Sequence, residues 1–173
     1  GYVGDWYKNR LIMGKQRSLP PSHLLRQVFE IARDYNEAKD LLCKTPLAAP
    51  VIFTLTGVKP GEGCIIERLE DAAEIKELTA GQSVSASNEF HSRFGTIGKG
   101  WRPRAMDSAG RHKQSCSISS PEMKQPDLSW LRPPILNKYT RLAMCADASI
   151  GSLLVRGYEG QSPVTEAFTI RIT

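Results

Sequence analysis

The sequence lacks any hydrophobic run long enough to cross a membrane. Its longest apolar stretch, residues 47–55, is far shorter than the roughly 18 residues that a membrane helix needs. No secretory leader is visible either, which favours a cytoplasmic location. The chain does not begin with Met, so we expect Gly1 to be a processed terminus or a boundary inside a longer protein, and the latter is favoured.

The sequence also lacks the short motifs that mark metal sites and common catalytic centres. Its four cysteines are widely spaced and include no C-x-x-C pair, so we expect buried free thiols and no metal or cofactor. The G-x-S-x-G, H-E-x-x-H, P-loop and dinucleotide patterns do not occur. No residue is therefore marked as a nucleophile by the motifs alone. The cysteines are Cys43, Cys64, Cys116 and Cys145.

The chain has a formal net charge of +5, and its basic residues are concentrated in the segment 91–113. Between His91 and Lys113 the only acid is Asp107, and the aromatic residues Phe94 and Trp101 lie among the basic ones. This pattern keeps open a non-catalytic binding module for nucleic acid or an acidic partner. Nucleic acid is not the expected partner, because the charges sit in one proline-broken loop. The basic residues are Arg93, Lys99, Arg102, Arg104, Arg111 and Lys113.

The periodicity of the chain changes from helical to strand-like near residue 46. Apolar residues recur at helical spacing over 24–32, and Asp34 with Glu37 resembles a capping box that starts a second helix. Residues 50–57 and 64–70 predict a hairpin, 73–81 and 82–88 predict two further strands, and 95–135 is loop-rich. Three more strands are predicted from 139 to 173, with Phe168, Ile170 and Ile172 on one buried face.

Helices followed by strands, without alternation, predict an α+β fold with a largely antiparallel sheet packed on helices. At 173 residues, 40% of them hydrophobic, the chain is long enough for one domain with its own core. We therefore expect residues 1–173 to form a single domain.

Three polar residues after the predicted strands are candidates for a site. The strand period places Asn88 on one face with Val84 and Ala86, which directs its amide into the interior or a cleft mouth. The alternative is an asparagine that closes an Asx turn. His91 and Arg111 follow in the same loop region. Their alternatives are a solvated histidine and a surface arginine paired with Asp107.

The segment "DYNEAKDLLCKTPLAAPVIFTLTGVKPGEGCIIER", residues 34–68, closely resembles the acid ceramidase family. The shared features are an "EAK-x-LL" helix, an "AP-x-x-F" strand, a "GEGC" turn and a strand that ends in Arg. The opening "GYVG" is similar to a stretch upstream in those enzymes. Asn88 and the segment from Asp107 to Arg111 follow in the order of the "TN…D…R" region that is also found in choloylglycine hydrolases and penicillin V acylases.

The resemblance implies an N-terminal-nucleophile (Ntn) hydrolase with layered αββα architecture that cleaves a linear N-acyl amide or transfers its acyl group. In that family a cysteine freed by autoproteolysis attacks the amide, and its own α-amino group serves as the base. Asn88 then matches the asparagine of the oxyanion hole and Arg111 matches the arginine beside the nucleophile. His91 and Trp101, in the loop after Asn88, are the candidate substrate-binding residues.

The sequence departs from the family in two respects. No cysteine here occupies the nucleophile's position, and Cys64 of "GEGC" is not that residue. After Asn88 the chain reads "EFHSR" where ceramidases carry Asp and Trp, and the loop before Asp107 is longer. We therefore expect the chain to be the C-terminal part of a larger enzyme whose missing N-terminal portion is its partner. A degenerate domain that keeps the fold without the chemistry is the remaining alternative.

Overall fold

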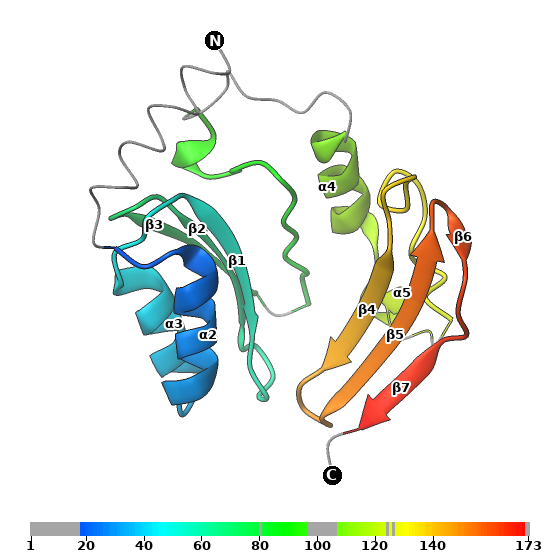
Figure 1. The fold of residues 1–173 in the computed structure, drawn as a ribbon, viewed down its shortest axis with the longest axis horizontal. Coiled ribbons are helices and arrows are strands. Elements are labelled where there is room, and N and C mark those ends of the chain that lie inside the picture. Colours follow the sequence, from blue (N-terminus) through cyan, green and yellow to red (C-terminus); the bar gives the residue numbers. More distant parts are fainter. Residues whose placement is uncertain (1–17, 80, 97–106, 124, 126, 172–173) are drawn as a thin grey trace.

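A computed structural model describes residues 18–79, 81–96, 107–123, 125 and 127–171. Figure 1 shows two antiparallel sheets that face each other, with helices on the outer side of the first sheet and a further helix between the two. An α+β fold built on antiparallel pairing is therefore confirmed. No helix in the described part of the chain is both long and apolar enough to span a membrane.

Two helices begin the described chain, as the helical spacing predicts. α2 covers Pro21–Ile31 and buries Leu24 and Val28. α3 covers Tyr35–Lys44, and its N-cap Asp34 accepts a hydrogen bond from the Glu37 backbone N–H at 2.9 Å. The capping start is thus confirmed. A helix end leaves backbone donors without partners, so this side chain fixes where α3 begins.

The first sheet has the order β1-β2-β3 and pairs only sequence neighbours. β1 (Val51–Thr56) and β2 (Gly63–Arg68) form the predicted hairpin, and β3 (Ala73–Glu77) adds the third strand. Alternate residues of these strands pack against α2 and α3 and form the main core. That core contains Leu24, Val28, Ala38, Leu42, Leu47, Phe53, Cys64 and Ile66.

The strand predicted over residues 82–88 is wrong, because the structure has no regular element there. Gly81 has φ +76° and turns the chain away from the sheet edge after β3. Ser85 and Ser87 then make their hydrogen bonds to a helix that follows in sequence. Asn88 therefore does not share a strand face with Val84 and Ala86.

The segment 95–135 is less loop-like than its composition predicts. After the short 3-10 helix η1 (Arg93–Thr96), α4 covers Ser108–Ser117 and α5 covers Ser120–Met123. Asp107 is the N-cap of α4, with φ 40° and a side chain that accepts from the Gly110 N–H at 3.1 Å. The residues "DSAG", which look like a turn, are instead the start of a helix.

The second sheet is centred on β5 (Ser152–Glu159). β4 (Leu142–Asp147) pairs along one edge of β5, while β7 (Phe168–Arg171) and the short β6 (Ser162–Pro163) pair with different parts of the other edge. A smaller core of Leu128, Ala143 and Tyr158 lies on one face. The three predicted terminal strands are thus confirmed.

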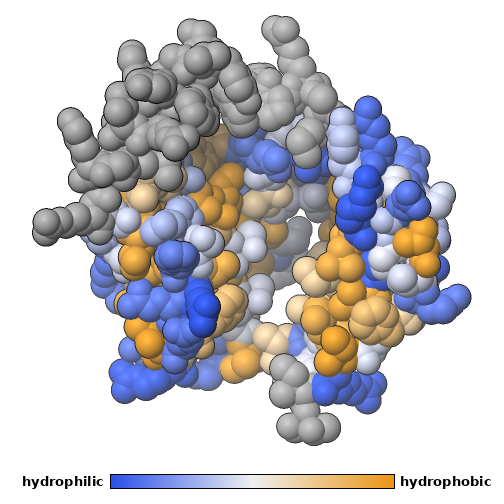
Figure 2. Space-filling model, in the orientation of Figure 1, coloured by the Kyte–Doolittle hydropathy of each residue, from blue (hydrophilic) through white to orange (hydrophobic). Residues whose placement is uncertain are grey.

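The other face of the second sheet is exposed, which corrects the expectation that Phe168 and Ile170 are buried. Their exposed fractions are 49% and 48%, and Leu142 and Met144 of β4 are 54% and 56% exposed. The strand register places all four on one face. Figure 2 shows hydrophobic side chains on the side of this sheet that faces the first sheet. Val155 of β5 lies on the same face but is only 7% exposed, so the exposed apolar residues are those of the flanking strands β4 and β7. Ile172 lies outside the described residues.

Candidate functional site

A buried carboxylate on β2 anchors the loop that carries the candidate residues. Glu67 is only 6% exposed. One oxygen accepts the His91 backbone N–H at 2.6 Å, and the other accepts the Ser92 N–H at 3.0 Å and the Ser92 hydroxyl at 2.6 Å. Hydrogen bonds to a charged acceptor are stronger than neutral ones. Glu67 therefore fixes the backbone three to four residues after Asn88.

Asn88 itself lies at the N-terminal end of α4. Its backbone N–H donates to the Ser108 hydroxyl oxygen at 3.0 Å, and that hydroxyl donates to the Ser87 hydroxyl at 2.9 Å. Asn88 is exposed, so its side chain is not enclosed in a buried turn. The loop is thus held at two ends, by Glu67 of β2 and by Ser108 of α4.

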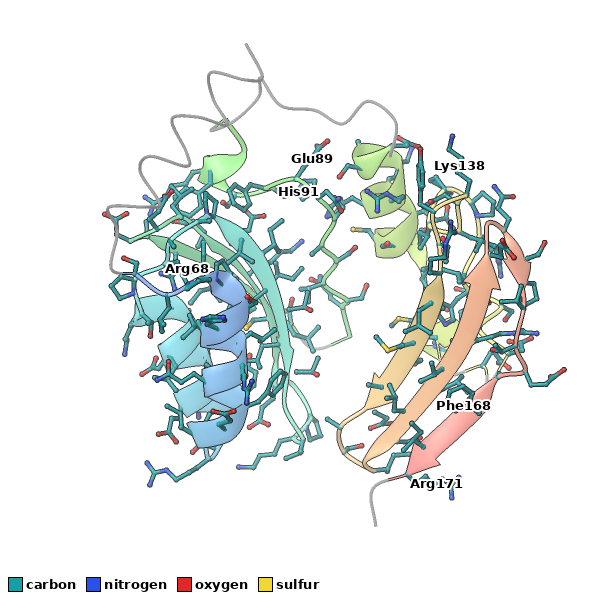
Figure 3. All side chains as sticks on the ribbon, viewed as in Figure 1. Arg68, Glu89, His91, Lys138, Phe168 and Arg171 are labelled. Carbon is teal, nitrogen blue, oxygen red and sulfur yellow. The ribbon has the colours of Figure 1, made fainter. Side chains whose placement is uncertain are left out.

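Two histidines stack between these anchors. The ring centroids of His91 and His112 are 3.7 Å apart, with 19° between the ring planes. His112 Nε2 lies 3.2 Å from the Ser85 carbonyl oxygen, which can only accept, so this nitrogen carries the hydrogen. Burial lowers the pKa of His112, and the neighbouring His91 lowers that pKa further. Figure 3 shows His91 on the loop between the first sheet and α4.

Arg111 follows Ser108 by one turn of α4 and is half-buried. It lines a groove of about 410 Å³ between α4, the 130–141 segment and β4. Asn88 is not among the described residues that line this groove. The structure brings both candidates to α4. Asn88 contacts this helix through its hydrogen bond to Ser108, and Arg111 is part of it. Their opening on one shared cleft stays a prediction.

A larger groove with mainly apolar walls runs beside the same loop. Its volume is about 660 Å³, and it lies between the β1–β2 hairpin, the segment after β3, and the start of α5. Val84, which the strand pattern places beside Asn88, lines this groove together with Leu78 and Ile118. A groove of this size and polarity is suited to an apolar chain.

The remaining predicted site residues have mixed outcomes. His91 is exposed and contacts His112 and Ser87, and its role in substrate binding stays a prediction. Trp101 lies outside the described residues. Of the basic group, Arg93 forms an ion pair with Glu74 of β3. Arg111 and Lys113 belong to α4 rather than to a loop, and the other three lie outside the described residues.

The four cysteines are free thiols. Burial raises the pKa of Cys43, Cys64 and Cys145, which makes each a poor nucleophile at neutral pH. The expectation of four buried thiols holds only for Cys64, because Cys43 and Cys145 are half-buried and Cys116 is exposed on α4, with its sulfur 3.8 Å from His112 Nε2. Among the described residues there is no cluster of three potential metal ligands.

Sequence reasoning missed Glu67, Ser108 and His112 as parts of this region. The sequence could have indicated Glu67, because this carboxylate follows two isoleucines in a strand that is predicted to be buried. A buried carboxylate needs a hydrogen-bond partner. His112 lies four residues before Cys116, a helical spacing that places both on one face. Ser108 carried no signal, since its partner is twenty residues away.

Known acid ceramidases are similar to about half of this chain. The acid ceramidase of Pan troglodytes is 40% identical over 85 residues, which is 47% of this chain and 20% of that protein. The acid ceramidase of Heterocephalus glaber is 42% identical over 81 residues, 45% of this chain and 19% of that protein. The Homo sapiens protein is 40% identical over 85 residues. No family model matches the chain.

These matches confirm the resemblance to the acid ceramidase family that residues 34–68 predict. The aligned part of the chain spans only about a fifth of the length of these relatives.

Proposed function

We propose that this chain is the C-terminal portion of an Ntn amidohydrolase that cleaves a ceramide-like N-acyl amide. The observation that carries the proposal is the 40% identity to acid ceramidases over 85 residues. The apolar groove supports it, because about 660 Å³ lies within the range of small-molecule sites and its walls suit an acyl chain. In this proposal residues 1–173 act as one domain of a longer protein, within an αββα layered fold.

The proposed chemistry assigns charge stabilisation to this chain and bond formation to the missing portion. A thiolate from the N-terminal portion attacks the amide carbon, and the carbonyl π electrons move to oxygen. The Asn88 amide donates hydrogen bonds to that oxygen, and Arg111 supplies a fixed positive charge. The tetrahedral intermediate then expels the amine, which takes a proton from the nucleophile's α-ammonium group.

The backbone contacts of Asn88 suit this role. An oxyanion donor is effective when it is already in place before charge develops. The loop around Asn88 has such support from Ser108 at its own N–H and from Glu67 at His91 and Ser92. Trp101 and His91 would contact the substrate next to this donor.

The exposed face of the second sheet is the proposed contact for the N-terminal portion. On this face Leu142, Met144, Phe168 and Ile170 of β4 and β7 are about half exposed, on either side of the buried Val155 of β5. A sheet face of this kind normally packs against another layer. The N-terminal portion would provide that layer and the second wall of the cleft.

The test uses the complete protein and Asn88→Ala. We expect kcat on an N-acyl amide to fall by roughly 10²- to 10³-fold, the usual loss for one oxyanion donor. Asn36→Ala is the matched control, because Asn36 is exposed on α3 and should leave kcat unchanged. Activity of the Asn88→Ala protein within a factor of three of the parent would overturn the assignment of Asn88.

A panel of substrates distinguishes hydrolysis of a ceramide-like amide from other reactions. We expect turnover of long-chain N-acyl amides, with transfer to an added amine measured as a second product. If the complete protein turned over no member of the panel, the amidohydrolase proposal itself would fail. The binding-module alternative would then be tested with oligonucleotides at physiological salt.

A further inference from the structure

The stacked histidines connect the Asn88 loop to α4, which also contact each other through hydrogen bonds. His91 belongs to the loop after Asn88, and His112 belongs to α4. Further contacts between this loop and α4 include the Ser87 and Asn88 bonds to Ser108 and the Ser85 carbonyl bond to His112. The ring stack differs from these hydrogen bonds because it brings two titratable groups face to face.

We infer that His91 and His112 form a pH-dependent latch that holds the Asn88 loop on α4 at neutral pH and loosens it on acidification. Two neutral imidazoles can lie face to face at 3.7 Å, whereas two imidazolium rings at that distance repel each other. His91 is exposed, so its ring can leave the stack without opening the core. Because His112 Nε2 already carries a hydrogen, the added proton goes to Nδ1.

The groups that face the pair do not neutralise a doubly charged stack. On His112, Lys76 of β3 opposes a positive charge, while Glu67 and the Ser85 carbonyl favour one, and the net effect with burial is a lowered pKa. Around His91 the neighbour is the Ser87 hydroxyl, 3.4 Å from Nε2. The carboxylate of Glu67 is engaged by backbone N–H groups and by Ser92.

Other charged groups lie near the pair, and they include Glu89, two residues before His91 on the same loop (Figure 3). Glu74 of β3 lines the same pocket as both rings but forms an ion pair with Arg93. On α4, Arg111 lines the groove on the β4 side, and Cys116 contributes a thiol. None of these supplies a carboxylate between the two rings.

The direction of the pH effect follows from the lowered pKa of His112. In the closed latch the pKa of His112 is lowered, whereas in the open latch His112 regains the ordinary histidine pKa near 6.5. At a pH between the lowered pKa of closed His112 and the ordinary pKa near 6.5, the open state binds more protons than the closed state. Opening is therefore favoured as the pH falls below about 6.5. The latch is therefore closed above that pH. Its importance for catalysis rests on the proposed function, but its existence does not.

The test is an NMR titration of the histidine rings in the chain described here, between pH 8 and pH 4.5. The chain has three histidines, and His23, exposed on α2, is the internal control. We expect the pKa of His112 to lie below that of an ordinary histidine, and to rise in His91→Phe, which keeps a flat ring but removes the charge that opposes protonation of His112. A pKa of His112 that is the same in the parent and in His91→Phe would overturn the latch.

A second readout follows the Asn88 backbone amide, whose bond to Ser108 reports contact between loop and helix. We expect its protection factor, corrected for the intrinsic pH dependence of exchange, to fall at least about tenfold from pH 7.5 to 5.0. His91→Phe should remove most of that fall, and His23→Gln should not. A fall that persists in His91→Phe would assign the effect to Glu67 and contradict the latch. Neither readout uses amide hydrolysis, so failure of the latch and failure of the proposed function are separable.

Discussion

Adjacent residues of β2 bury opposite charges on opposite faces of the first sheet. Arg68 points toward the helices and Glu67 toward the loop that follows Asn88. Arg68 is only 1% exposed and donates to the backbone carbonyls of Leu42, Thr45 and Ala72. Figure 3 labels it on the helix side of the sheet. Its role is therefore structural, whereas that of Glu67 bears on the candidate site.

Replacement of Arg68 tests the structural role. Arg68→Leu leaves three carbonyl acceptors without a donor, two of them at the end of α3. We expect the free energy of unfolding to fall by about 2–4 kcal/mol, the range for a buried charged partner removed from its hydrogen bonds. Urea denaturation measures this change.

Arg26→Leu is the matched control for that prediction. Arg26 pairs with Glu30 on the exposed side of α2, with 81% of its side chain exposed. Such pairs contribute little. An Arg68→Leu protein as stable as the Arg26→Leu protein would show that the three carbonyls find other partners.

The elements that sequence reasoning found are those with local signals. α2, α3 and the β1–β2 hairpin each combine apolar spacing, a capping residue and turn residues within a dozen positions. The structure differs from the sequence prediction where an element is determined by contacts between residues far apart in sequence. Residues 82–87 alternate like a strand, but Ser85 and Ser87 bond to α4 more than twenty positions later.

α4 escaped prediction because its composition is poor for a helix. Its sequence "SAGRHKQSCS" contains glycine and three serines, and it buries no residue. The helix depends instead on its cap, Asp107, and on the loop that packs against its N-terminal turn. A helix of this kind is visible only in its tertiary context.

The two N-caps should therefore differ in their effect on stability. Asp34→Ala removes the cap of α3, which carries the core residues Ala38 and Leu42, so we expect global stability to fall by about 1 kcal/mol. Asp107→Ala removes the cap of α4, which has no buried residue, so we expect local fraying of α4 and little change in the global transition. Amide exchange and thermal unfolding separate the two results.

Asp107→Asn is the control for the second cap. Asparagine keeps the accepting oxygen and tolerates the left-handed φ of 40°. It should retain the exchange protection of α4. Equal loss of protection in the alanine and asparagine variants would show that the carboxylate charge, and not the cap bond, holds this end of the helix.

At the scale of the whole molecule, two sheets with separate cores face each other across α4 and the Asn88 loop (Figure 1). The strand pattern that first singled out Asn88 is wrong, and the proposed roles of Asn88 and Arg111 rest on the family resemblance. The contacts that hold the Asn88 loop, from Glu67, Ser108 and His112, connect elements that no periodic pattern relates. Burial and charge in three dimensions were needed to find these contacts.

The chain alone should hydrolyse no amide, because none of its thiols is placed to attack. Burial holds the thiols of Cys43, Cys64 and Cys145 in the protonated form at neutral pH, and a protonated thiol is not a nucleophile. Cys116 is exposed beside His112, with its sulfur 3.8 Å from Nε2 and 3.9 Å from Nδ1, but it does not match the position of the family's nucleophile. We therefore expect no turnover of N-acyl amides above the buffer rate, and full activity only when the N-terminal portion is present. Single Cys64→Ser and Cys116→Ser variants complete the test. Thiol-dependent turnover by the chain that disappears in either variant would place the nucleophile inside this chain and reverse the assignment of its role.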